Sequence, residues 1–285
     1  MVLTLIVYLH MQMKLSIITV NLNNAGGLQK TIGSVINQTF RNFEFIIIDG
    51  ASKDGSVDII KEHAGSLSFW ISEPDKGIYA AMNKGIKYSN GEYCLFLNSG
   101  DYLMHNNVLE KIFRNSIIGE VVSGNVLKVR PNNKFRRVSS PEKVSLHKLC
   151  IHSLPHQATL IKRSLFEEIG LYNENYRIVS DWEFFLKTLV LHEKSYQHLD
   201  EDVSYFKIGG VSSSEENFTL SREESYDCLK RIFPKMAEDL MEYRYFYNSS
   251  VGQLITLLKK NKKLYDVMES FLGILFKSKK FIFGK

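Results

Sequence analysis

The feature that most constrains the fold is a regular alternation of short apolar runs and helix-patterned segments in the first third of the chain. The apolar runs lie at residues 14–20, 43–49, 67–71 and 93–97. Between them, apolar side chains recur at helical spacing in residues 28–36, 57–63 and 78–87. Continuous apolar runs are typical of parallel strands that are buried on both faces. The alternation therefore predicts an α/β fold with a mostly parallel central sheet flanked by helices.

Beyond residue 101 the pattern becomes less regular. The expected elements are a helix near residues 108–113, a strand pair around 121–129, a short helix at 163–169 that Gly170 ends, a helix at 180–191 and a strand at 203–214 that runs into a Gly/Ser loop. From residue 218 onward the pattern is helical. We therefore predict a main domain over residues 13–215, followed by a helical extension over residues 216–285.

The first residues of the chain form a separate short segment. Residues 2–9 are apolar, but the run is too short to span a bilayer. It also lacks a basic leader and a small-residue cleavage site, which argues against a signal peptide. We treat residues 1–12 as a separate N-terminal extension, which would be absent if Met11 or Met13 were the start.

Charge and cysteine content exclude some classes of partner. The formal net charge of the 285 residues is +5, but eight lysines against Asp266 and Glu269 give residues 258–285 alone a net charge of +6. The rest of the chain is near neutral, at about −1, which argues against nucleic acid because phosphate-backbone binding needs a basic folded surface. Three widely spaced cysteines indicate neither a zinc site nor a disulfide framework, and they fit a reducing cytoplasm.

Two turns that contain acids follow predicted strands and are candidates for a ligand site. Asp49 ends the second strand, and residues 98–101 (NSGD) follow the fourth. Ligands of open α/β sheets bind outside the carboxyl ends of the strands, and oxygen-bearing side chains suit Mg²⁺ or Mn²⁺. Each segment alone is also explained as a simple turn. Residues 21–27 lack the glycine fingerprint of dinucleotide-binding folds, which disfavours an oxidoreductase.

Five short motifs occur in a fixed order along the predicted sheet. They are residues 19–21 (TVN), 49–56 (DGASKDGS), 75–79 (DKGIY), 82–85 (MNKG) and 97–101 (LNSGD). Together they resemble family 2 glycosyltransferases, which have a GT-A fold and make bacterial surface polysaccharides; the resemblance covers roughly residues 14–214. It implies an inverting sugar transfer from a nucleotide-sugar donor, expected to be a UDP-sugar, to a hydroxyl of a glycan or lipid-linked acceptor.

The resemblance also implies roles for residues of a nucleotide-sugar half that extends to about residue 101. Asp49 would accept a hydrogen bond from the uracil-type ring, and Asp75 and Lys76 would approach the ribose and diphosphate. Residues that would meet the base and ribose are Thr19, Val20 and Asn21. Other donor-side candidates on these motifs are Asn23, Ser52, Asn83, Asn98, Ser99 and Gly100.

A metal role is implied for the last of these motifs. Asp101 matches the final acid of the family's Asp-x-Asp motif and would hold Mg²⁺ or Mn²⁺. The chain departs from that motif because Ser99 stands where the first acid would be. A single carboxylate should hold the metal weakly without the diphosphate, so strict metal dependence is less firmly implied than a metal site.

Residues 155–158 (PHQA) and 179–183 (VSDWE) also fit the family's pattern, on the acceptor side. Asp181 aligns with the acid of the family's Glu-Asp motif and would be the general base, since an inverting transfer needs a carboxylate to take the acceptor hydroxyl's proton. Ser180 replaces the Glu of that motif. The same residues also form a capping-box pattern, in which Glu183 would reach back to the cap amide. The acceptor-side candidates are His156, Gln157, Trp182 and Glu183, and a structural histidine is an equal explanation of His156.

The C-terminal residues predict a basic amphipathic helix. Its apolar face consists of Leu264, Val267, Met268, Phe271, Leu272 and Leu275, and lysines flank it on both sides. Such a helix is typical of an interfacial anchor on anionic lipid, and the alternative is packing on the body or on a second subunit. We expect a cytoplasmic enzyme, and for residues 258–285 both interpretations stand: contact with the inner face of the cytoplasmic membrane, or packing on protein.

A second functional hypothesis keeps the fold but not the chemistry. Ser99, Ala81 and Ser180 all depart from the family at motif positions. They motivate the alternative of a sugar-nucleotide or glycan-binding protein without transferase activity. The sequence indicates neither the donor sugar nor the oligomeric state.

Overall fold

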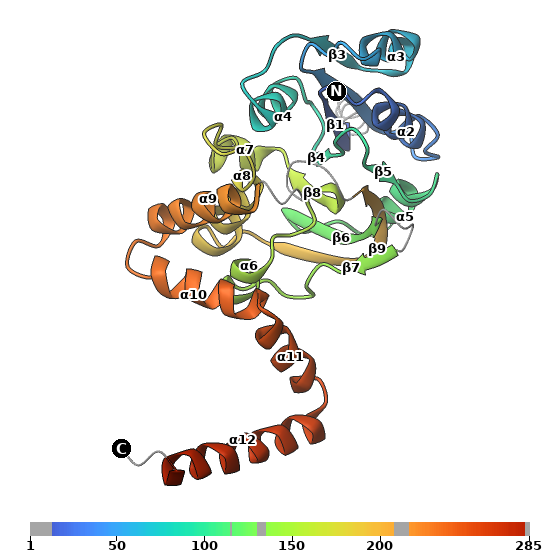
Figure 1. The fold of residues 1–285 in the computed structure, drawn as a ribbon. Helices are drawn as coiled ribbons and strands as arrows, with labels where there is room; N and C mark the ends of the chain where they lie inside the picture. Colours follow the sequence, from blue (N-terminus) through green and yellow to red (C-terminus); the bar gives the residue numbers. More distant parts are fainter. Residues whose placement is uncertain (1–12, 115, 130–134, 208–216, 283–285) are drawn as a thin grey trace, which may run out of the picture. The chain divides into compact units, whose positions relative to one another are not determined.

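The computed structural model describes residues 13–114, 116–129, 135–207 and 217–282, and the predicted extension at residues 1–12 lies outside them (Figure 1). The chain divides into two compact units, Met1–Cys228 and Leu229–Lys285. The division falls within helix α9 (Asn217–Ile232). The first part of the expected helical extension therefore belongs to the first unit.

A mixed sheet forms the centre of the first unit. Its strands are β1 (Leu15–Asn21), β2 (Phe43–Asp49), β3 (Phe69–Ser72), β4 (Tyr93–Phe96), β5 (Tyr102–Leu103), β6 (Val121–Val129), β7 (Phe135–Val138), β8 (Thr159–Lys162) and β9 (Tyr196–Lys207). Their order is β3-β2-β1-β4-β8-β6-β9-β5, with β7 paired to β6. The first four strands are parallel, as their continuous apolar runs predict. Strand β8 runs antiparallel to both β4 and β6, so the sheet as a whole is mixed rather than mostly parallel.

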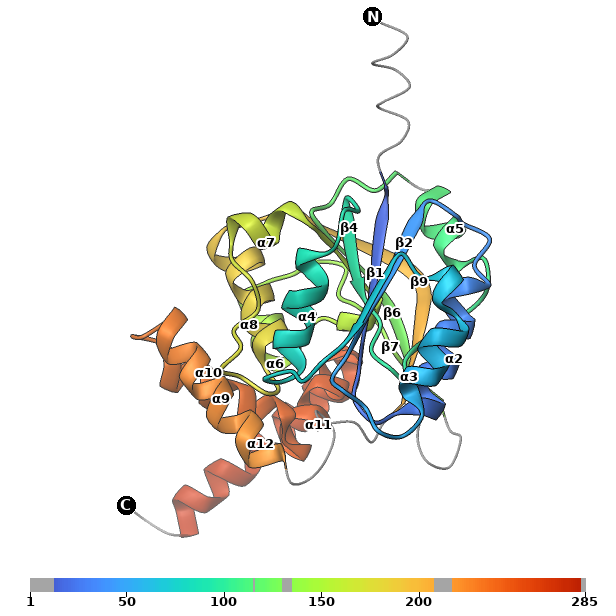
Figure 2. The same cartoon turned by 90° about the horizontal axis from the view of Figure 1, so that it is seen from above.

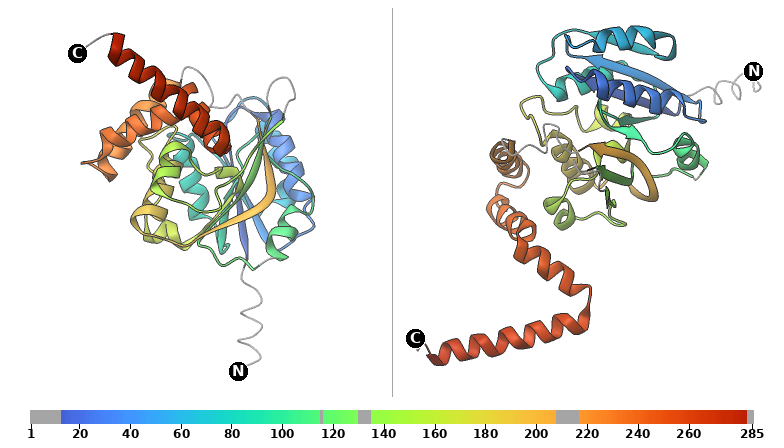
Figure 3. Two further views of the ribbon diagram at one scale, coloured as in Figure 1. Left: turned by 90° about the horizontal axis from the view of Figure 1, so that it is seen from below. Right: turned by 45° about the vertical axis from the view of Figure 1, so that its right-hand side comes forward.

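Helices cover both faces of this sheet, as predicted. Figure 2, with the opposite view in Figure 3 (left), shows two groups of helices on opposite sides of it. One group comprises α2 (Ala25–Ile36), α3 (Ser56–Glu62) and α5 (Val108–Arg114). The other comprises α4 (Ile78–Lys87), α6 (Leu146–Ile151), α7 (Ser164–Glu168) and α8 (Ser180–Leu186). Short 3₁₀ turns lie at η1 (Ala64–Ser66) and η2 (His156–Ala158).

Several element predictions need correction. The strand pair expected around residues 121–129 is one nine-residue strand, β6, whose antiparallel partners β7 and β8 lie elsewhere in the chain. The helix expected at 180–191 is α-helical only to Leu186 and continues as a π-helical turn, η3 (Lys187–Leu191). Strand β9 begins earlier than predicted, and the Gly/Ser loop after it lies outside the described residues. The helix end at Gly170 is confirmed, since its φ of 108° is one that glycine adopts readily.

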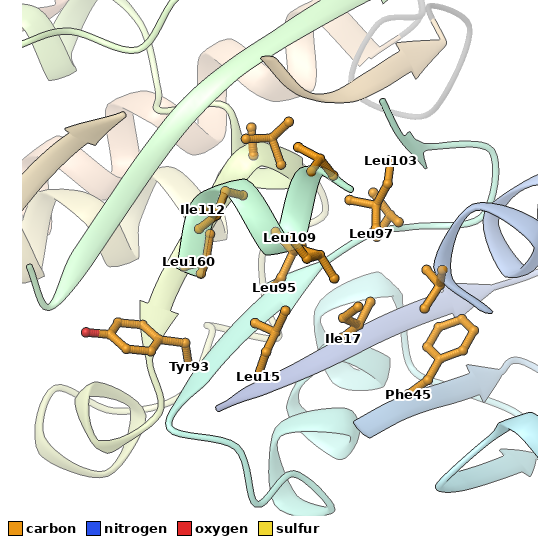
Figure 4. Close-up of a cluster of buried hydrophobic side chains, with 14 of the residues drawn as sticks. Leu15, Ile17, Phe45, Tyr93, Leu95, Leu97, Leu103, Leu109, Ile112 and Leu160 are labelled. Atoms are coloured by element: carbon orange, nitrogen blue, oxygen red, sulfur yellow. The ribbon is translucent and has the colours of Figure 1, made fainter. Parts of the chain in front are cut away.

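The main core lies between the sheet and the α2 and α5 helices (Figure 4). Leu15, Ile17 and Leu95 are fully buried there, and burying each such side chain contributes about 1.5–3 kcal/mol. On the other face of β1, a Cβ placed on Gly85 would lie 2.4 Å from Ile18 Cγ2. Glycine therefore allows α4 to pack directly on β1, which brings the polar side chains of α4 close to the ends of the strands.

The second unit is helical, as predicted. It contains the end of α9, followed by α10 (Ala237–Asn248), α11 (Ser250–Lys259) and α12 (Lys262–Ile282). Ser249 caps α11 by accepting a hydrogen bond from the Gly252 amide at 3.1 Å. In the part of the chain that the structure describes, no helix combines the length and apolarity needed to cross a bilayer.

Candidate functional site

The carboxyl ends of the first three strands bring polar side chains together around Asp49. The parallel register places Asn21 beside Asp49, and Asp49 beside Ser72. The Asp49 carboxylate is fully buried and accepts hydrogen bonds from Asn21 Nδ2 (2.7 Å), Ser72 Oγ (2.6 Å), Ser52 Oγ (2.6 Å) and the Ser52 amide (2.9 Å). Burial alone would raise the pKa of Asp49, but these hydrogen bonds outweigh it and hold the pKa below its ordinary value. The carboxylate is therefore charged at neutral pH.

Two amide oxygens at these strand ends have no partner within the described residues. They are Asn21 Oδ1 and Asn98 Oδ1, both buried. Asn21 donates its amide to Asp49 and Ser52, which orients its oxygen away from them. A buried acceptor without a partner is costly unless a ligand or water supplies a donor or a cation. These oxygens thus suit a ligand that brings N–H or O–H groups or a bound cation.

The other donor-side candidates in and just after β1 mainly make hydrogen bonds that join neighbouring backbone segments. Thr19 is buried and donates its hydroxyl to the Leu97 carbonyl at 2.7 Å, which joins the ends of β1 and β4. Val20 is buried beside it. Asn23 accepts from the Lys53 amide at 2.8 Å, and its own amide donates to Ser52 Oγ at 2.8 Å. The two turns after β1 and β2 are therefore locked to each other.

The loop before α4 carries an ionic cluster next to Asp49. A Cβ on Gly50 would lie 3.7 Å from Asp75 Oδ2, so Asp75 borders the residue that follows Asp49. Asp75 also pairs with Lys84 Nζ at 2.6 Å, and Lys84 pairs with Glu73 at 2.7 Å. Burial would lower the pKa of Lys84, but hydrogen bonds to Asp75 and Glu73 raise it above its ordinary value. Lysine 84 was not among the predicted site residues, although it lies within the MNKG motif.

Lys76, in contrast, is exposed and makes no ion pair with any residue in the described ranges. It follows Asp75 directly and precedes Gly77, whose φ of 140° turns the chain into α4. An exposed lysine at this turn can reach a phosphate without first breaking an ion pair.

The turn after β4 is held by α2. Thr31 Oγ1 donates to the Asp101 carbonyl at 2.6 Å and accepts from the Gly100 amide at 3.0 Å. Asn24 Nδ2 donates to the Ser99 carbonyl at 2.8 Å. The Asp101 side chain is mostly buried. The N-cap residue of α2 and a residue of its second turn therefore fix the segment expected to hold a metal.

The residues of this turn fit a divalent cation only in part. Among the described residues, no group of three or more His, Cys, Asp or Glu side chains could hold a metal ion. Asp101 supplies one carboxylate, and Asn98 Oδ1 is a buried oxygen without a protein partner. Mg²⁺ commonly takes one or two protein carboxylates and completes its shell with phosphates and water. The oxygen donors here fit such a cation provided that a phosphate ligand completes the site.

Asp181 lies at the start of α8 and contacts the nucleotide-sugar half through Tyr79. The Tyr79 hydroxyl lies 2.9 Å from Asp181 Oδ1 and 2.7 Å from the Ile178 carbonyl. Tyr79 comes from α4 and is buried. Burial and the neighbouring Asp181 carboxylate raise the pKa of Tyr79 well above its ordinary value, so its hydroxyl stays protonated. The single hydroxyl proton of Tyr79 is therefore shared between the Ile178 carbonyl and Asp181 Oδ1, and this contact orients Asp181.

His156 and Asn83 both contact Tyr172 and hold the segment around it. His156 stacks on Phe96 with ring centroids 4.8 Å apart, and its Nε2 lies 2.8 Å from the Tyr172 hydroxyl. Asn83 Nδ2 donates to the Tyr172 carbonyl at 2.8 Å, while its oxygen accepts from the Tyr172 amide at 3.0 Å. Asn83 was predicted as a donor-side residue, but it is buried and its side chain binds the backbone of Tyr172.

The pKa of His156 gives a testable pH dependence. Burial lowers this pKa, and the Asp181 charge opposes the shift only in part. Because the folded-state pKa lies below the unfolded value of about 6.5, the unfolded state binds more protons as the pH falls. His156 thus contributes stability above about pH 6.5 that is lost as the pH falls through its folded-state pKa. In urea unfolding at pH 7.5, 6.5 and 5.5, we expect wild type to lose more stability than His156→Gln, which cannot titrate; equal losses would contradict this assignment.

Of the remaining acceptor-side candidates, Trp182 and Glu183 are buried and Gln157 is partly buried. Trp182 is buried and donates its indole N–H to the Leu149 carbonyl at 2.6 Å. The Gln157 carbonyl accepts from Ser204 at 2.7 Å. Glu183 is buried and pairs with Lys187 at 2.9 Å. These contacts stabilise α8 and its surroundings.

The capping-box interpretation of residues 180–183 is wrong. Helix α8 begins at Ser180 with Val179 as its N-cap, and no side chain caps it in that position. The Ser180 hydroxyl instead accepts from the Asn173 amide at 2.6 Å. The hydroxyl is thus occupied by an amide seven residues earlier, and Glu183 pairs with Lys187 one turn further along the helix. The local pattern therefore does not explain why Asp181 stands in the first turn.

Comparison with known proteins is consistent with this arrangement. Residues 16–177 match Glycosyl transferase family 2, and the chain therefore belongs to that family. It is 30% identical over 208 residues to a PGL/p-HBAD biosynthesis glycosyltransferase of Mycobacterium bovis, a match that covers 70% of this chain and 79% of the relative. It is 34% identical over 188 residues to an uncharacterized glycosyltransferase of Mycobacterium tuberculosis, with 62% and 70% covered.

Two solved structures are similar in fold. S. aureus TarS residues 1–349 in complex with UDP-GlcNAc has a TM-score of 0.66 and 19% identity, with 89% of this chain and 78% of that chain covered. The mannosyltransferase PcManGT from Pyrobaculum calidifontis in complex with GDP-Man and Mn²⁺ has a TM-score of 0.61 and 14% identity, with 92% and 80% covered. The predicted GT-A fold is thus confirmed.

Proposed function

We propose that this glycosyltransferase moves a sugar from a UDP-sugar to a hydroxyl of a glycan or lipid-linked acceptor, with inversion at the anomeric carbon. The observation that carries the proposal is the meeting of Asp49, the unpartnered Asn21 oxygen and the Asp101 turn at the ends of β1, β2 and β4. Solved structures of similar fold contain UDP, UDP-GlcNAc or GDP-Man, which supports a nucleotide-sugar donor here.

The residues proposed to bind the nucleotide-sugar donor are assigned from the hydrogen bonds and charges they offer. A charged carboxylate such as that of Asp49 binds an N–H donor like the imide of uracil more strongly than a neutral group would. Because Asp49 already accepts four hydrogen bonds, the imide would take the place of one of them. Asn21 Oδ1 accepts a further donor from the base or ribose. Asp75 lies beside Gly50 and takes a ribose hydroxyl, while the exposed Lys76 approaches the diphosphate.

Asp101, with Asn98 Oδ1 close by in the same turn, would hold Mg²⁺ or Mn²⁺ once the diphosphate is present. Such an ion neutralises negative charge on the leaving diphosphate. The chain's own contribution is the rigid turn, which Thr31 and Asn24 hold in place before the donor arrives.

Asp181 is the proposed general base. Its carboxylate takes the proton of the acceptor hydroxyl while that oxygen forms a bond to the anomeric carbon. The bond from the anomeric carbon to the diphosphate oxygen breaks in the same step, and the electron pair leaves with the diphosphate. Tyr79 keeps Oδ1 of Asp181 in place because it donates to that oxygen. Attack opposite the leaving group inverts the anomeric configuration.

Activity measurements separate this proposal from the alternative of a binding protein. The protein is incubated with UDP-glucose, UDP-GlcNAc and GDP-mannose, with and without Mn²⁺, and melting temperature and released nucleotide are both recorded. Stabilisation by one UDP-sugar together with UDP release is the expected result, since a ligand that binds only the folded state stabilises it. Stabilisation without release or transfer to any acceptor would support a sugar-nucleotide-binding protein. No stabilisation by any nucleotide sugar would contradict the proposal.

If the acceptor is lipid-linked, the C-terminal helix α12 would hold the enzyme at the membrane that contains the acceptor. The exposed apolar side chains of α12 include Leu264, Val267 (64%), Phe271 (56%), Leu272 and Ile274. Lys259, Lys260, Lys262 and Lys263 precede them. The predicted Leu275 and the later lysines lie outside the side chains that the structure describes. Exposed apolar residues beside lysines favour attachment to an anionic membrane, so we propose a cytoplasmic protein that contacts the membrane through this helix.

Vesicle binding tests the membrane contact. Phe271→Asp should reduce cosedimentation with phosphatidylglycerol vesicles about tenfold or more, because a charge replaces an inserted ring. Ser270→Asp adds the same charge to an exposed residue on the more polar side of the helix and serves as the matched control. Equal binding by wild type and Phe271→Asp would show that α12 is not the anchor.

A further inference from the structure

We propose that Glu224, on the first helix of the C-terminal region, positions the general base. The inference rests on the proposed role of Asp181. Glu224 lies in the part of α9 that belongs to the first unit, and only 7% of it is exposed. Its carboxylate accepts hydrogen bonds from three consecutive backbone amides, those of Arg177 (2.7 Å), Ile178 (2.9 Å) and Val179 (3.2 Å).

These three amides lie immediately before α8, in the loop that leads to the base. Val179 is the N-cap of α8 and has no side chain that could cap it. A charged carboxylate that accepts three amides fixes the loop more firmly than neutral acceptors could, since charge-assisted hydrogen bonds are about twice as strong. Glu224 therefore supplies from a distant helix the order that the local sequence lacks.

The same loop connects directly to the base. The Ile178 peptide donates its N–H to Glu224 and presents its C=O to the Tyr79 hydroxyl. That hydroxyl is also within hydrogen-bond distance of Asp181 Oδ1. A continuous chain of contacts thus runs from Glu224 through Ile178 and Tyr79 to Asp181. A shift of the loop would move both the Ile178 carbonyl that contacts the Tyr79 hydroxyl and the start of α8.

A second acidic residue on α9 strengthens this attachment. Asp227, one turn beyond Glu224, accepts a hydrogen bond from the Tyr176 hydroxyl at 2.5 Å. Two carboxylates of one helix therefore hold residues 176–179. Neither contacts the residues around Asp49 or Asp101 in the described contacts, so a change at Glu224 should act on the base and not on donor binding.

The test replaces Glu224 with glutamine, whose single oxygen cannot accept all three amides. We expect kcat to fall at least tenfold while the Kd for UDP with Mn²⁺ stays within twofold of wild type. Exchange of the amides of residues 177–179 with deuterium should become faster. Glu223→Gln, an exposed neighbour on the same helix, is the matched control and should behave as wild type. If Glu224→Gln does not fold, Glu224→Asp keeps the charge but shortens the reach, and it is measured in the same way.

A double-mutant cycle with Asp181→Asn separates positioning from a general loss of stability. If Glu224 acts through the base, Glu224→Gln lowers kcat at least tenfold in wild type but less than twofold in the Asp181→Asn background. An equal loss in both backgrounds, or wild-type kcat for Glu224→Gln, would overturn the inference. If Asp181→Asn alone keeps wild-type kcat, the assignment of the base fails instead, so the two failures are distinguishable.

Discussion

Replacing Asp181 with asparagine should lower kcat by about 10²–10⁴-fold, the range that general base catalysis contributes. Asparagine matches the shape of aspartate and can still accept the Tyr79 hydrogen bond at Oδ1, but it cannot take a proton. Asp181 is partly exposed, so its replacement should leave the fold intact. Initial rates of UDP release at saturating donor and acceptor give kcat, and the melting temperature reports the fold.

The neighbouring acid on α8 provides the control for this prediction. Glu183 is buried and pairs with Lys187, so Glu183→Gln should lower the melting temperature and leave most of the turnover. Normal turnover in Asp181→Asn together with an inactive, folded Glu183→Gln would assign the base to Glu183. Wild-type kcat in both variants would contradict any carboxylate base on this helix.

Asp101→Asn should reduce kcat/KM for the donor roughly 100-fold or more, because a cation on the diphosphate stabilises developing charge by several kcal/mol. The mostly buried side chain is the carboxylate of the NSGD turn, and Thr31 holds the turn through its backbone. The variant therefore keeps the turn while removing one charge. Titration calorimetry with UDP should show that Mn²⁺ strengthens binding to wild type and has little effect on the variant.

A surface carboxylate controls for the loss of charge. Asp58 is exposed on α3, and within the described ranges its ion pair is with Lys61 at 4.0 Å. Asp58→Asn should bind UDP and Mn²⁺ as wild type does. If Mn²⁺ strengthened UDP binding equally in wild type and Asp101→Asn, Asp101 would not be the metal ligand.

The meeting of polar residues at the strand ends could be predicted from the sequence, because parallel strands all end at the same edge of a sheet. Continuous apolar runs indicate buried parallel strands, and their polar last residues must then meet at one edge of the sheet. Asn21 and Asp49 do lie side by side in this way. Strand β8 escaped prediction because a four-residue run carries little signal, and its antiparallel insertion between β4 and β6 depends on tertiary packing.

Contacts between distant segments could not be predicted from one sequence. Tyr79 and Asp181 are 102 residues apart, and the motif that contains Tyr79 does not indicate its partner. Even over a short separation, the Ser180 hydroxyl accepts from the amide of Asn173, seven residues earlier, rather than capping its own helix, which overturned the capping pattern. Glu224 lies in a segment that the sequence assigned to the helical extension, yet it holds the loop of the proposed base.

A crystal structure with UDP and Mn²⁺ tests the proposed donor site most directly. The account predicts uracil within hydrogen-bond distance of Asp49 and Asn21, and an anomalous manganese peak between Asp101 and the diphosphate. Nucleotide or manganese bound elsewhere, with the ends of β1, β2 and β4 unchanged, would contradict it.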